Sequence, residues 1–283
     1  MWTWWVSRSS RAQKTFGTVP VAELEKADIQ GYLTAAVAEG LSSESVRDLR
    51  VRLRGLLSLA ADWGWISPAA NPAAGRFRLP ARAPVRERRY PTPEEFRKLV
   101  EALPQPYKAI VALAGLSGLR RGELAALRWN DIGPDSVRVD ESVYRGVLGS
   151  PKTPRSRRTV KIPTKAVELL EAWRSQSKFT EPEDFVFAIR TNTPIDLNRA
   201  LERLIKPLAE KRGLPRFSYH DFRHAYTTWG RKAGVAAEVM RDLVGHTSVT
   251  MTQDVYSHMD DDDGEAVAMI GRYVWPESRP EAA

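Results

Sequence analysis

The four histidines of the chain all lie between residues 220 and 258: His220, His224, His246 and His258. Histidine is the side chain best suited to proton transfer and metal binding near neutral pH. His220 and His224 are four residues apart, so on a helix they share one face, much as in the His-Glu-x-x-His zinc motif. Metal binding is disfavoured because Arg223 would lie beside a dication and Asp221 is shorter than the motif's glutamate. The clustering therefore indicates a functional site and not core packing, and the alternative, a zinc hydrolase, predicts activity that chelators abolish.

Three basic side chains that are far apart in the sequence also have settings suited to a cleft: Arg120, Lys152 and Arg223. Arg120 directly follows the turn Ser117-Gly118-Leu119 at the expected start of a helix, where a side chain covers little core. Guanidinium groups bind phosphate oxygens through two parallel hydrogen bonds. Each residue taken alone is better explained as a surface charge, so the inference depends on the occurrence of all three.

The composition of the 283 residues fits an acidic partner. Hydrophobic residues make up 42%, enough for a sizeable core, and the absence of cysteine excludes disulfides, thiolate nucleophiles and cysteine-bound zinc. Lys and Arg number 43 against 35 Asp and Glu, which favours a polyanion. No apolar run approaches the roughly 18 residues of a membrane span, and the aromatic start is not typical of a signal peptide. We expect a cytoplasmic protein with no membrane partner.

The elements that position these residues form a mainly α protein with an α+β catalytic domain. Residues 20–64 are predicted to be helical, with one apolar stripe that includes Val46, Leu49 and Leu53. A Pro- and Arg-rich stretch follows. The predicted division is a helical domain over 1–80, a linker over 81–91 and a second, α+β domain over 92–283.

The catalytic domain is expected to open on a capping box at Thr92-Pro93-Glu94-Glu95. Its predicted elements are helices at 93–103 and 106–117, a β region at 136–162, mostly helix over 164–255 with breaks near 182–194 and 213–218, and a last helix at 264–274. The acidic run Asp260 to Asp263 is interpreted as a solvated loop.

Four segments occur in the order typical of one enzyme family: Ser117–Ile132 (SGLRRGELAALRWNDI), Pro151–Pro163 (PKTPRSRRTVKIP), His220–Thr228 (HDFRHAYTT) and Leu243–His258 (LVGHTSVTMTQDVYSH). Together they closely resemble the catalytic domain of tyrosine recombinases of the phage-integrase type, over about residues 90 to 275. The Gly245-His246 pair, ten residues before Tyr256, is part of that resemblance. The N-terminal third, over 1–80, resembles the family's helical core DNA-binding domain less closely. We expect it to be short at its start and without an arm-binding domain, either because the recombinase has no arm sites or because the start of the chain is missing.

The resemblance implies that Tyr256 attacks a DNA phosphate and forms a 3′-phosphotyrosyl link, which conserves the phosphodiester energy for rejoining. Arg120 and Arg223 would hold the non-bridging oxygens, with Glu123 in support. A free tyrosine has a pKa of about 10, so proton transfer must be assisted. Lys152 would protonate the leaving 5′-oxygen, His220 would act as the second acid–base group, and His246 would donate to the phosphate. The matching site needs no metal and no cofactor.

Phosphate contacts supply DNA affinity without sequence choice. The arginines expected to make them are Arg47, Arg50, Arg54, Arg76, Arg78, Arg155, Arg157 and Arg158.

The resemblance implies a site-specific recombinase, bacterial or phage-encoded and nucleoid-associated, that integrates or excises a mobile element such as a prophage or plasmid. The expected partners are double-stranded DNA attachment sites, the other subunits of a homo-tetramer on two sites, and an accessory directionality factor. Residues 264–275 would pack either on a neighbouring protomer or in cis. The alternatives are a catalytically idle DNA-binding protein derived from a recombinase, and a type IB topoisomerase that relaxes DNA.

Overall fold

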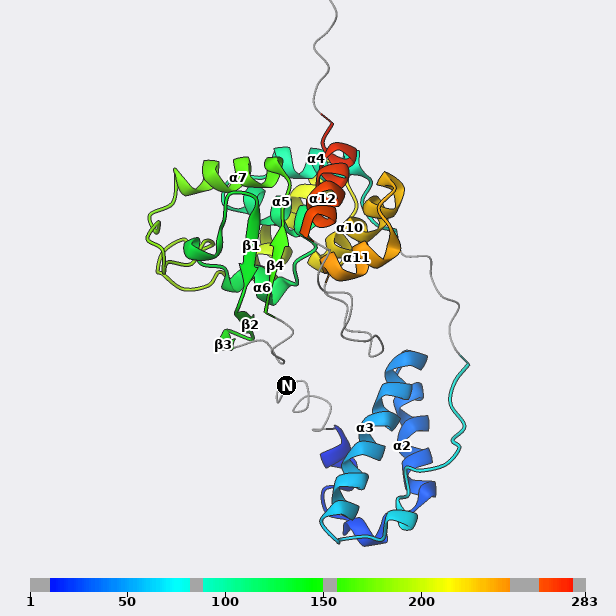
Figure 1. Cartoon of the computed structure of the whole chain (residues 1–283). Coiled ribbons are helices and arrows are strands. Elements are labelled where there is room, and N and C mark those ends of the chain that lie inside the picture. The colour runs from blue at the N-terminus through cyan, green and yellow to red at the C-terminus, as the bar shows by residue number, and fades with distance from the viewer. Residues whose placement is uncertain (1–10, 82–88, 150–156, 245–259, 277–283) are drawn as a thin grey trace, which may run out of the picture. The chain divides into compact units, whose positions relative to one another are not determined.

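The computed structural model describes residues 11–81, 89–149, 157–244 and 260–276 (Figure 1). The chain divides into two compact units, residues 1–87 and residues 88–283. Lys152, Arg155, His246 and Tyr256 lie outside the described residues, as does 82–88 of the expected linker.

The N-terminal unit is built on two packed helices, α2 (Lys26–Ala38) and α3 (Ser43–Asp62), with short 3-10 turns at Val21–Glu23 and Pro68–Ala70. The helical prediction for 20–64 is therefore interrupted twice, at 24–25 and at 39–42. Ser42 begins α3 by accepting a hydrogen bond from the Ser45 N–H at 3.2 Å. The predicted stripe faces the core, where Val46 and Leu49 pack with Ile29 and Leu33 of α2.

The C-terminal unit, residues 88–283, contains the remaining elements: α4 (Pro93–Ala102), α5 (Tyr107–Ser117), α6 (Arg121–Ala126), a 3-10 turn (Trp129–Asp131), β1 (Ser136–Val139), β2 (Ser142–Tyr144), β3 (Val147–Gly149), β4 (Arg158–Lys161), α7 (Thr164–Arg174), α8 (Leu197–Ala200), a π turn (Leu201–Ile205), α9 (Lys206–Lys211), α10 (Tyr219–Ala233), α11 (Ala237–Val244) and α12 (Asp260–Val274). The apolar helix α5 lies at the centre, with Ala109 to Ser117 buried, and packs against α4, α7 and α10. The capping box predicted at Thr92 is present at the start of α4.

The predicted β region forms two small antiparallel sheets. Strands β1 and β4 pair with Val137 opposite Val160, so the two apolar arms face the core together. Strands β2 and β3 form a separate hairpin in which Val143 lies opposite Leu148. These strands come between α6 and α7 and carry Arg158 to the end of α6 that bears Glu123.

The C-terminal helix α12, red in Figure 1, packs against α4 and α10 of its own chain. Val267, Ile270 and Val274 are buried in the core of the same unit, and packing on a neighbouring protomer stays a prediction. The acidic run Asp260 to Asp263 is the first turn of this helix and not a loop. Acidic residues suit that position because the N-terminal end of a helix carries partial positive charge.

Candidate active site

The turn between α5 and α6 fixes the position of Arg120. Helix α5 ends at Gly118, whose backbone is left-handed with φ at 63°, and Arg120 becomes the N-cap residue of α6. Glu123 completes the first turn: its Oε2 accepts a hydrogen bond from the Arg120 N–H at 2.9 Å, and its Oε1 accepts one from Arg120 Nη1 at 3.0 Å. Glu123, three residues further along the chain, therefore holds the Arg120 side chain in place.

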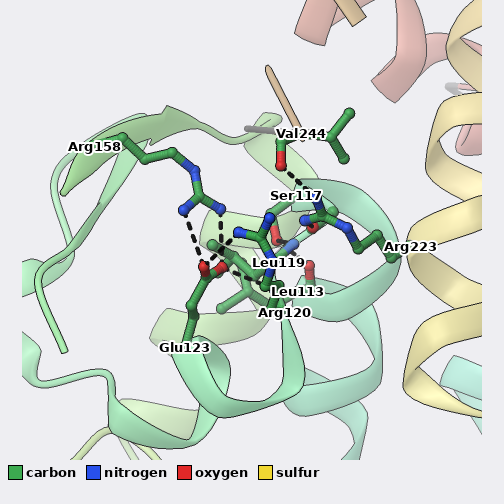
Figure 2. A network of polar contacts seen from close by, with 9 residues as sticks. Leu113, Ser117, Leu119, Arg120, Glu123, Arg158, Arg223 and Val244 are labelled. Atoms are coloured by element: carbon green, nitrogen blue, oxygen red, sulfur yellow. Dashed lines mark hydrogen bonds and ion pairs between the residues drawn. The ribbon is translucent and has the colours of Figure 1, made fainter. Parts of the chain in front are cut away.

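A second arginine binds the same carboxylate. Arg158, the first residue of β4, donates from Nη1 to Glu123 Oε1 at 3.0 Å and from Nη2 to Oε2 at 2.8 Å, so Arg120 and Arg158 both face this carboxylate (Figure 2). Burial alone raises the pKa of Glu123, but the hydrogen bonds and charge of Arg158, together with the hydrogen bonds from Arg120, lower it overall. Glu123 is therefore ionised at neutral pH.

Arg223 approaches the same region from α10. Its guanidinium donates to the carbonyl oxygens of Gly118 and Val244 and is buried (Figure 2). Burial, followed by the charges of Arg120 and Arg158, lowers the pKa of Arg223 to about 10, against the opposing effect of Glu123. Arg223 therefore keeps its positive charge at neutral pH. Arg120 and Arg158 pair with the carboxylate of Glu123, and Arg223 lies in the same region on two neutral carbonyls. This excess of positive charge favours binding of an anion such as a phosphodiester.

His220 and His224 lie on one face of α10, as their spacing predicts. Their Nε2 atoms are 2.9 Å apart, and the ring of Tyr90 stacks on His224 with centroids 5.2 Å apart. Asp221, which the zinc motif would use as a base, instead caps α10 by accepting hydrogen bonds from Ser218. No local pattern in the sequence indicates the contact between Tyr90 and His224, because the two residues are more than a hundred positions apart.

The arginines expected to bind DNA fall into two groups. Arg54, Arg76, Arg78 and Arg157 have exposed side chains. Arg47 donates to the Pro80 carbonyl at 2.9 Å, and Arg50 donates to the Gly75 carbonyl and lies over the ring of Phe77, at 5.2 Å from its centroid.

The guanidinium groups of Arg47, Arg50 and Arg158 are thus hydrogen-bonded inside their own units, and the expected DNA contacts of these three arginines stay predictions. For Arg47 and Arg50 the physical reason is that the segment after α3 runs back along this helix, and its carbonyls require hydrogen-bond donors. For Arg158 it is the buried Glu123 carboxylate, which requires a cation.

Within the described residues, no three His, Asp or Glu side chains are grouped as metal ligands. In the same part of the chain, every helix is too short or too polar to cross a membrane.

Comparisons with known proteins agree on one family. Residues 89–263 match the Phage integrase family. The "Tyrosine recombinase XerC-like" protein of Caldanaerobacter subterraneus subsp. tengcongensis is 27% identical over 272 residues, covering 84% of this chain and 68% of that protein.

Two solved structures share the fold. The Tn1549 transposon integrase in complex with a circular intermediate DNA has a TM-score of 0.71 at 20% identity, covering 91% of this chain and 89% of that one. A lambda integrase tetramer bound to a Holliday junction has a TM-score of 0.63 at 19% identity, covering 89% of this chain and 72% of that one. Since the family match spans more than half of the sequence, the chain belongs to the phage integrase family of tyrosine recombinases.

Proposed function

We propose that this chain is a site-specific DNA recombinase that cuts and rejoins DNA through a phosphotyrosine intermediate on Tyr256. The observation that carries the proposal is the grouping of Arg120 and Arg158, which pair with Glu123, and Arg223, which is held on the Gly118 and Val244 carbonyls nearby. A site with this excess of positive charge stabilises the negative charge that develops on a phosphodiester during phosphoryl transfer. Family membership supports the same reaction.

In the cleavage step the Tyr256 oxygen forms a bond to phosphorus while the bond from phosphorus to the 5′-oxygen breaks. The phenol proton leaves with assistance from His220, and the 5′-oxygen takes up a proton from Lys152. Rejoining reverses these steps with a 5′-hydroxyl from another strand. The bond energy stays in the phosphotyrosine, so no external energy source is required.

Arg120 and Arg223 hold the non-bridging oxygens, and His246 donates to the same phosphate. Arg223 has its terminal nitrogens on two carbonyls in the structure without DNA, so phosphate binding requires it to share or exchange these partners. Loss of one such donor costs on the order of 10²–10³ in rate.

The DNA partner is double-stranded, and the chain acts as a homo-tetramer on two attachment sites. The solved relatives bound to DNA and the lambda integrase tetramer on a Holliday junction support this assembly. The exposed arginines Arg54, Arg76, Arg78 and Arg157 supply phosphate contacts, and an accessory factor sets the direction of recombination.

The test is capture of the covalent intermediate. Wild-type protein is incubated in EDTA with a nicked attachment-site duplex, and the products are separated on a denaturing gel. We expect a protein–DNA adduct with wild type and none with Tyr256→Phe, while both bind the duplex. Tyr273→Phe, which changes an exposed tyrosine of α12, is the matched control and should form the adduct. No adduct with wild type, or an adduct with Tyr256→Phe, contradicts the proposal.

Lys152→Ala should slow cleavage in the same assay and leave DNA binding intact, since its role is to protonate the leaving oxygen. A substrate whose leaving group needs no proton should restore its rate. Equal slowing on both substrates would contradict the assignment.

A further inference from the structure

We propose that Arg158 is a positioning residue for the cleavage reaction: it occupies the carboxylate of Glu123 and so prevents that carboxylate from neutralising Arg120. The inference rests on the proposed function, because Arg120 is assigned to the scissile phosphate. It gives Arg158 a role other than the DNA contact expected from the basic hairpin segment.

The hydrogen bonds around Glu123 carry the argument (Figure 2). Each carboxylate oxygen accepts one hydrogen bond from the Arg158 guanidinium and one from Arg120. Arg158 therefore pairs with both carboxylate oxygens through its two terminal nitrogens, whereas the Arg120 side chain donates to the carboxylate from one nitrogen, Nη1. Its second contact with Glu123 is made by the backbone N–H.

The burial of Glu123 determines what happens when Arg158 is removed. Glu123 is 6% exposed and the Arg158 side chain 14% exposed, whereas the Arg120 side chain is 47% exposed. A buried carboxylate requires a cation, so without Arg158 the nearest compensating group is the Arg120 guanidinium. A guanidinium that pairs with a carboxylate through two nitrogens cannot offer the same two N–H groups to a phosphate.

The position of Arg158 also joins two parts of the site. It begins β4, where its backbone pairs with Val139 of β1, and its side chain reaches α6. Lys152 lies six residues earlier on the same stretch of chain. One ion pair therefore fixes the strand that follows Lys152 to the helix that begins after Arg120.

The experiment is a double-mutant cycle with Arg158→Ala and Glu123→Gln, measured as the rate of adduct formation on the nicked duplex at saturating DNA. We expect Arg158→Ala to lower the rate on the order of 10²-fold, because the Glu123 carboxylate would then pair with Arg120 and remove one donor from the phosphate. Glu123→Gln should lower the rate of the wild-type protein, because Arg120 and Arg158 lose their shared partner. In the Arg158→Ala background it should raise the rate about tenfold, because the captured Arg120 is released.

The salt dependence of DNA binding separates this role from a phosphate contact. Arg157→Ala is the matched control, since Arg157 is the exposed neighbour of Arg158. It should reduce the slope of log K against log salt by about 0.9, whereas Arg158→Ala should leave that slope unchanged. Thermal melting of each variant, with Arg158→Met retaining the apolar stem, shows whether the fold survives.

The inference is overturned if Glu123→Gln fails to raise the rate in the Arg158→Ala background, or if Arg158→Ala reduces the salt slope as Arg157→Ala does. If wild type forms no adduct, the proposed function fails, and titration with inorganic phosphate still tests the inference. Followed by NMR of the arginine side chains, phosphate should bind wild type and the double variant more tightly than Arg158→Ala. Equal binding by all three would overturn the inference independently of cleavage.

Discussion

Replacing Gly118 by alanine should both destabilise the catalytic unit and impair the site. Gly118 has φ of 63°, in the left-handed region where a side chain is unfavourable. An added Cβ would lie 2.8 Å from Cδ1 of Tyr226 and 3.1 Å from Cγ1 of Val244. The Gly118 carbonyl also accepts a hydrogen bond from Arg223, so any shift of this turn moves a partner of that guanidinium.

The magnitude follows from two separable costs. The left-handed backbone costs a non-glycine residue about 1–2 kcal/mol, and overpacking a filled core costs about 1–3 kcal/mol. Gly118→Ala should lower the free energy of unfolding by both amounts, about 2–5 kcal/mol. Gly213→Ala is the matched control, because Gly213 has φ of 68° and no described atom within 4 Å of an added Cβ. It should show only the backbone cost.

The assay is calorimetric unfolding of the full chain, read at the transition of the unit spanning 88–283. At about 2–4 °C per kcal/mol for a unit of this size, Gly118→Ala should melt several degrees below Gly213→Ala. At a temperature where both remain folded, Gly118→Ala should form less covalent adduct and Gly213→Ala a normal amount. Equal melting temperatures for the two variants would refute the steric reasoning, and normal adduct formation by Gly118→Ala would refute the link to Arg223.

Three further predictions concern named contacts. The folded structure lowers the pKa of Glu123, so its charge stabilises the fold above pH 4.5, the ordinary pKa, and this stabilisation is lost as the pH falls through the lowered pKa. The difference in free energy of unfolding between wild type and Glu123→Gln, measured in urea, should therefore shrink in acid. A difference that stays constant with pH would contradict the pairing. Trp229→Phe should lower stability by about 1 kcal/mol, measured by urea unfolding, because the indole N–H donates to the Pro91 carbonyl at 3.2 Å. Arg76→Ala should weaken the salt dependence of DNA binding, whereas Arg50→Ala should chiefly lower the melting temperature of the N-terminal unit, and the reverse pattern would show that Arg50 is the DNA contact.

Much of this molecule is determined by short-range sequence patterns. The apolar stripe from Val46, the capping box at Thr92 and the apolar arms of β1 and β4 appear where they are predicted, because helix caps and the periodicity of burial are local properties. The resemblance to the phage integrase family is confirmed by comparison. The local patterns depend on neighbouring residues, and the family resemblance depends on the order of motifs along the chain.

The partners of individual charged side chains are decided by the tertiary structure. The sequence places Arg158 in a basic segment, but it does not indicate that the buried carboxylate of Glu123, 35 residues away, pairs with it. Arg47 and Arg50 likewise lie on the polar face of α3, and only the returning segment after α3 supplies the carbonyls they bind. A charge pattern shows that a side chain requires solvent, a phosphate or a protein partner; which of these it meets depends on how distant segments pack, because burial removes the solvent and imposes the partner.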